Sequence, residues 1–147
     1  MELILLIGGQ GAGKSTFYKA HLFATHLRLN LDMLKTRKRE QALLQAALTC
    51  GQRCVIDNTN PAAADRAGYI AAAHAHHFKV VGYYFDSPLE ALLERNALRS
   101  GKANIPEKGV RATYARLQAP RYQEGFAELH RVLTLPDGQF EVTRMTE

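Results

Sequence analysis

Short apolar runs recur along the chain, and each ends at a polar residue or a turn. They cover residues 3–7, 27–30, 54–57 and 79–85. Apolar runs of four to eight residues are typical of strands in a buried parallel sheet. We therefore predict four strands at these positions, although the second, Leu27 to Asn30, is recognised by alternation rather than by a continuous run.

Helical spacing of apolar residues fills the intervals between these runs. Gly51 is a typical helix stop, Pro61 suits a first helical position, and Ser87 to Glu90 form a capping-box pattern. An apolar stripe marks the second interval through Leu34, Ala42, Leu43, Ala46 and Ala47. We predict helices over about residues 15–26, 33–49, 61–76, 87–100 and 106–117.

The last part of the chain shows a different pattern. Residues 131–135 and 140–144 have the composition of short strands. Asp137-Gly138 lies between them, and this dipeptide is typical of a tight hairpin turn. The pattern predicts a C-terminal β-hairpin.

A glycine-rich segment follows the first predicted strand and precedes the first predicted helix. It contains the pattern G-x-x-x-x-G-K-[ST], the phosphate-binding P-loop. Its glycines let backbone N–H groups turn toward a phosphate, and the helix N-terminus adds positive partial charge. Lys14 is expected on the β- and γ-phosphates and Ser15 on Mg²⁺. The nucleotide-binding residues predicted here are Gly9, Gln10, Gly11, Ala12, Gly13, Lys14, Ser15 and Thr16.

Alternation of strands and helices predicts an α/β fold with right-handed crossovers. Together with the P-loop it predicts a three-layer P-loop NTPase fold: a central, mostly parallel sheet flanked by helices, with a small arginine-bearing lid at about residues 95–110. Ligands bind such sheets at the carboxyl ends of the strands. The P-loop, Asp32 and Asp57 follow the first three strands, so we expect them to converge.

Length and composition agree with one domain over residues 1–147. The longest apolar run is far too short to span a membrane, and no signal peptide is visible, so a cytoplasmic protein without a membrane partner is expected. The net charge of +5 permits an anionic partner such as a nucleotide or nucleic acid. Cys50 and Cys54 are interpreted as ordinary thiols, and the histidines at 74, 76 and 77 as residues favoured at a helix end.

Two aspartates carry the candidate chemistry beside the P-loop. Asp57 closes an apolar strand, the position of the acidic residue that holds Mg²⁺ in P-loop proteins; the alternative is a turn residue before Asn58. Asp32 fits two roles equally well. It can accept the proton of an acceptor hydroxyl, or it can cap the following helix.

Two sets of basic residues also allow two interpretations each. Arg95 and Arg99 share one side of a predicted helix, where they can contact a triphosphate or simply favour the helix C-terminus. A basic run follows Asp32. On a continuous helix Lys35, Lys38 and Arg39 share a face, and the run either attracts a polyanionic substrate or forms a solvated surface. The run consists of Lys35, Arg37, Lys38 and Arg39.

Several segments together resemble the kinase domain of the polynucleotide 5′-hydroxyl kinases, as in phage and animal polynucleotide kinase-phosphatases. The resemblance runs from Leu3 to about Phe126. It rests on the P-loop through Phe17, on Val55 to Pro61 (Val-Ile-Asp-Asn-Thr-Asn-Pro), and on three later segments. These are Arg95-Asn96 through Arg99 with Ile105-Pro106, Ala119-Pro120, and Glu124-Gly125-Phe126.

The resemblance implies a role for each matching position. Lys14 and Ser15 would engage the phosphates of ATP and Mg²⁺, Asp32 would be the general base toward a 5′-hydroxyl, and Arg99 would be the lid arginine on the triphosphate. We accordingly assign Lys14, Asp32 and Arg99 to catalysis, and Arg95 with Arg99 to the nucleotide. Ser15 and Asp57 are assigned to the metal. The acceptor set is Asp32, Lys35, Asp57 and Thr59.

One position departs from the family pattern. The family typically has Asn-Arg-Asp near the base, whereas this chain has Asn30-Leu31-Asp32. Lys35 can serve as the second basic contact to the substrate phosphate. The sequence lacks a phosphatase half, so a free-standing ATP-dependent kinase is expected. Leu31 keeps a small-molecule kinase for a sugar, nucleoside or antibiotic hydroxyl as the alternative, and a non-catalytic nucleotide-binding protein is the third.

Overall fold

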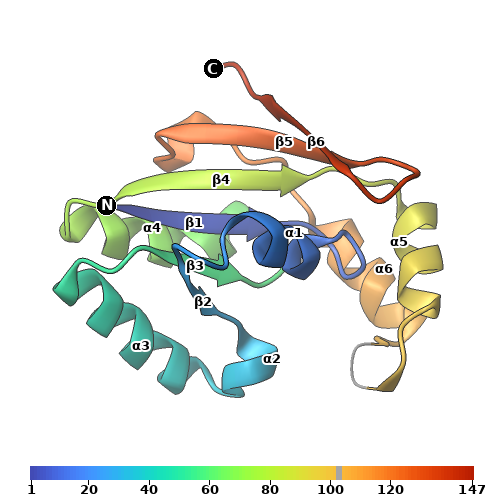
Figure 1. The fold of residues 1–147 in the computed structure, drawn as a ribbon, viewed down its shortest axis with the longest axis horizontal. Helices are drawn as coiled ribbons and strands as arrows, with labels where there is room; N and C mark the ends of the chain where they lie inside the picture. The colour runs from blue at the N-terminus through green and yellow to red at the C-terminus, as the bar shows by residue number, and fades with distance from the viewer. Residues whose placement is uncertain (102–103) are drawn as a thin grey trace.

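The computed structural model describes residues 1–101 and 104–147, so Lys102 and Ala103 of the predicted lid loop lie outside the described residues. Its centre is a sheet with strand order β2-β3-β1-β4-β5-β6 (Figure 1). The first five strands pair in parallel, and β6 pairs antiparallel with β5. The strands are β1 Glu2–Ile7, β2 Leu27–Leu29, β3 Cys54–Asp57, β4 Lys79–Phe85, β5 Glu128–Thr134 and β6 Phe140–Arg144.

Helices cover both faces of this sheet. They are α1 Lys14–His21, α2 Leu31–Leu34, α3 Arg37–Cys50, α4 Ala63–Ala75, α5 Leu89–Ala97 and α6 Glu107–Arg116. The alternate side chains Leu3, Leu5 and Ile7 of β1 pack with α3 and α4 in one core. Ile4 and Leu6 face the other core, which contains side chains of α1, α5 and α6. The predicted three-layer fold is confirmed.

The central position of β1 places the P-loop in the middle of the molecule. All five residues from Leu3 to Ile7 are buried because β3 and β4 pair with β1 on either side. Parallel strands end at the same edge, so the segments after β1, β2 and β3 meet there (Figure 1). Helices α5 and α6 also lie at this edge.

The predicted helix over residues 33–49 is wrong, because the structure has two helices there. Asn30 caps α2, and its side chain accepts a hydrogen bond from the Met33 N–H. The chain then turns at Lys35, whose φ is 75°, and Thr36 caps α3 by accepting from the Arg39 N–H. Both polar residues are N-caps and each starts a helix, while the turn at Lys35 ends the first of the two. The predicted apolar stripe is corrected accordingly. Ala42, Leu43 and Ala46 are exposed, while the buried face of α3 is Glu40, Leu44, Ala47 and Leu48.

Smaller corrections concern helix starts and ends. Helix α1 ends at His21, five residues before the predicted end. Helix α4 starts after Ala62, with Asp65 bonding back to the Ala62 N–H, so Pro61 precedes the helix. Ser87 does not cap α5, because its hydroxyl accepts a hydrogen bond from Arg95 instead. Gly51 ends α3 in the left-handed conformation as predicted.

The predicted C-terminal hairpin is confirmed, and β5 starts three residues earlier than expected. Its turn contains Gly138 at φ 83°, and the Leu135 N–H bonds to the Gln139 carbonyl at 2.8 Å. Among the described residues, no helix has the length and apolar character needed to cross a membrane.

A buried arginine joins segments that are far apart in the sequence. The Arg66 side chain is fully buried and binds Glu124 through two hydrogen bonds of 2.8 and 3.0 Å. The same guanidinium donates to the carbonyls of Asn60 and Pro61. Arg66 therefore fixes the turn after β3 onto the segment before β5, and these are two of the segments that carry the family resemblance.

Candidate active site

The P-loop adopts a conformation that depends on its glycines. Gly11 and Gly13 have φ values of 86° and 96°, which residues other than glycine rarely adopt. A Cβ on Gly13 would also lie 3.1 Å from the Phe140 ring of the C-terminal hairpin. The loop leads directly into α1, so its N–H groups and the helix N-terminus face the same space.

Lys14 is buried at the start of α1. Its ammonium donates to the carbonyls of Gly8 and Gly9 at 2.9 and 2.8 Å. Burial lowers the pKa of Lys14 from 10.5 to about 8. The carboxylates of Asp57 and Asp32 oppose this pKa shift, while the Arg99 guanidinium adds to it, so all three groups act on the ammonium.

Asp57 lies at the end of β3, next to the start of α1. The Ser15 hydroxyl donates to its Oδ2 atom at 2.9 Å. The Arg28 Nε atom donates to the same oxygen at 2.7 Å, and Arg28 Nη2 donates to the Ser15 hydroxyl at 3.0 Å. Arg28 therefore holds the two predicted metal ligands together.

Sequence reasoning missed Arg28. It stands in the short β2 strand, where alternation explains its presence without any function. Its guanidinium also lies 5.9 Å from the centre of the Tyr18 ring, within the range of a cation–π contact. The sequence offers one signal only, which is a charged residue inside a short predicted strand.

The turn after β3 is fixed against β1. Asn60 has φ 46°, and its amide donates to the Leu6 carbonyl at 2.8 Å. The Gly8 N–H donates to the Thr59 carbonyl at 3.0 Å. These bonds tie the Asp-Asn-Thr-Asn turn to the first residue of the P-loop, so Asp57 is placed beside it by the backbone itself.

Asp32 lies in α2, the one-turn helix after β2. Asn30 is the N-cap of α2, so the alternative role of Asp32 as the cap is excluded. The Asn30 amide also donates to the Asp57 carbonyl, which joins the ends of β2 and β3. Asp32 is exposed and faces the cavity beside the P-loop.

These segments enclose a cavity of about 450 Å³. The convergence predicted for the P-loop, Asp32 and Asp57 is confirmed, and Arg99 and Thr59 also reach this cavity. Asn30, Leu31, Asn58 and Ile105 complete it, although they were not assigned to the site. The lining residues are Gln10, Gly11, Lys14, Ser15, Asn30, Leu31, Asp32, Asp57, Asn58, Thr59, Arg99 and Ile105.

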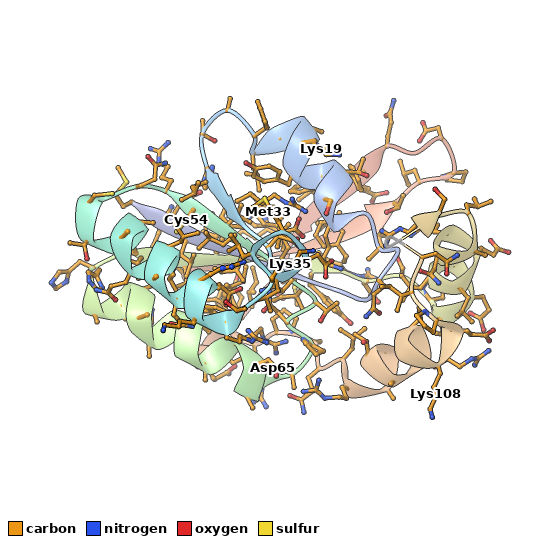
Figure 2. The ribbon with its side chains drawn as sticks, turned by 90° about the horizontal axis from the view of Figure 1, so that it is seen from below. Lys19, Met33, Lys35, Cys54, Asp65 and Lys108 are labelled. Atoms are coloured by element: carbon orange, nitrogen blue, oxygen red, sulfur yellow. The ribbon has the colours of Figure 1, made fainter. Side chains whose placement is uncertain are left out.

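The predicted basic contacts are divided between the cavity and its surroundings. Arg99 lines the cavity, whereas Arg95 donates to the Gly11 carbonyl and the Ser87 hydroxyl, both at 3.3 Å. Lys35 is exposed beside α2 and is not among the lining residues (Figure 2). It stands outside α3, so the predicted common helix face of Lys35, Lys38 and Arg39 is wrong.

Mg²⁺ prefers hard oxygen ligands and usually takes only one or two from the protein beside substrate phosphates. The Ser15 hydroxyl and the Asp57 carboxylate offer two such oxygens, 2.9 Å apart, at the edge of the phosphate loop. This donor set fits Mg²⁺. The Arg28 guanidinium already compensates the charge of Asp57 in this arrangement.

The mostly parallel sheet and a P-loop facing an aspartate across a cavity define a protein with the P-loop kinase fold. The family model AAA_33, described as an AAA domain, matches residues 3–123, and the chain belongs to this family.

A curated relative from Schizosaccharomyces pombe, named bifunctional polynucleotide phosphatase/kinase, is 28% identical over 135 residues. The match covers 89% of this chain but 33% of the relative, so the chain spans about a third of that protein's length. The resemblance noted in the sequence is thereby confirmed.

Solved structures share the fold at low identity. A gluconokinase from Sinorhizobium meliloti has a TM-score of 0.63 and 18% identity, over 90% of this chain and 82% of that one. Kti12 from Chaetomium thermophilum, in complex with ADP-AlF3, has a TM-score of 0.69 and 17% identity, over 89% and 88% of the two chains.

Proposed function

We propose that this protein is an ATP-dependent kinase that transfers the γ-phosphoryl group to the 5′-hydroxyl of a polynucleotide. The observation that carries the proposal is the placement of Lys14 and Asp32 on one cavity, Lys14 in the segment after β1 and Asp32 in the segment after β2. A phosphate-binding lysine and a carboxylate on one cavity are what transfer to a hydroxyl requires. The polynucleotide kinase name of the relative supports the choice of acceptor.

In this proposal the P-loop and Lys14 bind the β- and γ-phosphates. ATP replaces the Gly8 and Gly9 carbonyls as partners of the Lys14 ammonium. Arg99 contacts the triphosphate from the α5 side, where it stabilises charge that develops during transfer. Positioning and charge stabilisation supply most of the catalysis, because little covalent chemistry is left to the protein.

Asp32 acts on the acceptor. Its carboxylate accepts the proton of the 5′-hydroxyl while the oxygen attacks the γ-phosphorus and the bond to the β-phosphate oxygen breaks. Asp32 is exposed and lines the cavity, so a chain end can reach it from outside. Lys35 and the basic residues at the start of α3 follow Asp32 in the chain, are exposed, and would attract the phosphates of a strand.

Ser15 and Asp57 are the residues that would hold Mg²⁺. Bound there, Mg²⁺ neutralises phosphate charge on the nucleotide. Arg28 keeps the Ser15 hydroxyl and the Asp57 carboxylate in place, since it donates to both.

A second candidate is a kinase for a small-molecule hydroxyl. It is favoured by the apolar side chains of Leu31 and Ile105, which line the cavity. Leu31 stands where the polynucleotide kinases typically have an arginine, and it removes one charged contact to a substrate phosphate.

Transfer of labelled γ-phosphate from ATP tests both candidates in one experiment. The panel contains 5′-hydroxyl DNA and RNA oligonucleotides, their 5′-phosphorylated counterparts, nucleosides and sugars. We expect label on the 5′-hydroxyl oligonucleotides alone. Label on a nucleoside or sugar in preference to the oligonucleotides would favour the second candidate, and no transfer to any acceptor would contradict both.

A further inference from the structure

The helix that carries Asp32 is too short to be stable by itself. Helix α2 has four residues, and an isolated turn of this length does not persist in water. Its conformation therefore depends on contacts with other segments. The Asn30 cap is one such contact, and the second is a hydrogen bond of 3.0 Å from the Leu31 N–H to the Asn58 Oδ1 atom.

Asn58 uses both ends of its side-chain amide. Its Oδ1 atom accepts from Leu31, and its Nδ2 group donates to the Glu40 Oε2 atom at 2.8 Å. A carboxylate accepts hydrogen bonds and cannot donate one when ionised, so Glu40 requires the Nδ2 end of the amide. The Oδ1 end is then left for the backbone N–H of α2. Glu40 thus fixes which way the Asn58 amide faces.

Glu40 is itself held from the other side. It has no exposed surface, and its Oε1 atom accepts from the Tyr69 hydroxyl at 2.6 Å. Burial and the bond to Glu40 raise the pKa of Tyr69 to about 12, so the phenol keeps its proton. Arg37 donates to the Tyr69 oxygen at 2.8 Å. Four elements are joined in this way: α4, α3, the turn after β3, and α2.

Stability alone does not explain a buried carboxylate at this place. Taking a carboxylate out of water costs several kcal/mol, and apolar residues of similar size are often as stabilising as a buried polar network. Glu40 also belongs to α3, whose other buried residues are Leu44, Ala47 and Leu48. Each of these side chains has hydrogen-bond partners, and the network ends at α2, the helix that carries Asp32.

We propose that Glu40 is a positioning residue, which holds the α2 backbone through Asn58 and thereby sets the place of Asp32 at the cavity. The catalytic consequence rests on the proposed function, since it requires that Asp32 act on the acceptor. The structural consequence, an ordered α2, does not.

A pair of substitutions that exchanges the two partners tests this. Glu40→Met removes both acceptor oxygens at a similar side-chain size, and Asn58→Asp places a carboxylate against Glu40, so each single variant loses the complementary bond. The double variant Glu40→Gln/Asn58→Asp restores it with the roles reversed, because the carboxylate at position 58 then accepts from the Leu31 N–H and from the amide at position 40. Glu141→Met, on the exposed strand β6, is the matched control.

The first readout is hydrogen exchange of the peptide that covers residues 30–36. Both single variants should lose protection there by at least tenfold in exchange rate, and the double variant should regain most of it. The control should match the parent protein. Unchanged protection in Glu40→Met would overturn the positioning role, whether or not the protein transfers phosphate.

The second readout is the split between kcat and KM in the transfer assay. Glu40→Met should lower kcat about tenfold and change the KM for ATP less than twofold, because a misplaced base affects the transfer step. The double variant Glu40→Gln/Asn58→Asp should recover to within about threefold of the parent. A double variant no more active than the two single variants, or a loss confined to the KM for ATP, would overturn the inference. An inactive parent would instead contradict the proposed function, and hydrogen exchange would still decide the structural role.

Discussion

The two ends of the cavity are built in different ways. At the proposed nucleotide end, one continuous segment from Gly8 to Ser15 supplies the loop, the lysine and a proposed metal ligand. At the proposed acceptor end, Asp32 stands on a one-turn helix that is held by Asn30, Asn58 and, through Asn58, by Glu40. The first end depends on local backbone conformation and the second on side chains from several elements. Substitutions in those distant elements should therefore affect the acceptor end and leave the nucleotide end unchanged.

The largest effect should come from Asp32→Asn, which separates the two ends. Asparagine keeps the size of the side chain but does not accept a proton at neutral pH, so the transfer rate should fall by on the order of 10²–10⁴-fold. ATP affinity, measured by titration calorimetry, should stay within about twofold of the parent. A collapse of affinity together with rate would place Asp32 at the nucleotide end instead.

Lys14→Ala should affect the nucleotide end and should lower turnover by on the order of 10²–10³-fold, since one charged contact to the transferring phosphate is lost. ATP affinity should fall as well, which distinguishes this variant from Asp32→Asn. Circular dichroism should show that the fold is kept. Turnover near that of the parent, with any acceptor, would refute the kinase proposal.

ATP affinity should depend on pH through Lys14. The pKa of the buried ammonium is about 8 without ligand, and phosphate charge raises it on binding. Protons are then taken up as ATP binds, so affinity is highest below pH 8 and falls as the pH rises, by about tenfold between pH 7 and 9. Titrations in buffers of different ionisation enthalpy measure this uptake. Lys14→Arg, which stays charged, should show a flat profile over the same range.

The smallest effect concerns the basic residues outside the acceptor end. If Lys35 and Lys38 contact a strand of phosphates, the KM for an oligonucleotide should rise with salt, with a slope of about 0.7 per contact. Lys35→Ala/Lys38→Ala should lower that slope by about 0.7 for each of the one or two phosphate contacts that are lost. Lys19→Ala/Lys108→Ala is the control, because these lysines stand on α1 and α6, away from Lys35 (Figure 2). A double variant that keeps the parental slope would leave Lys35 and Lys38 as solvated residues.

The same contrast explains what the sequence could predict. The P-loop is a local motif, so it can be recognised from consecutive residues. The strands β1, β3 and β4 are short, mostly apolar runs, so their positions can be predicted in the same way. The break between α2 and α3 was missed because the stripe from Leu34 to Ala47 has helical spacing, and the caps at Asn30 and Thr36 outweigh it.

Arg28, Asn58 and Glu40 could not be assigned, because their importance lies in partners that are distant in the sequence. Arg28 is 29 residues from Asp57, and Glu40 is 18 residues from Asn58. Each is unremarkable within its own strand, turn or helix. The pairing of β2 with β3, and the packing of α3 beside them, brings Arg28 to Asp57 and Glu40 to Asn58.

The C-terminal hairpin has a consequence for how the protein is made. Phe140 lies against Gly13, and the Thr134 hydroxyl donates to the Ala12 carbonyl across 122 residues of chain. The segment that packs against the P-loop is synthesised more than a hundred residues after it. Contacts of such long sequence separation form slowly, and a chain that still lacks them exposes apolar surface. During synthesis the P-loop is therefore made before the hairpin that contacts it, and a nascent chain stalled before residue 134 would carry the motif without the support of the hairpin.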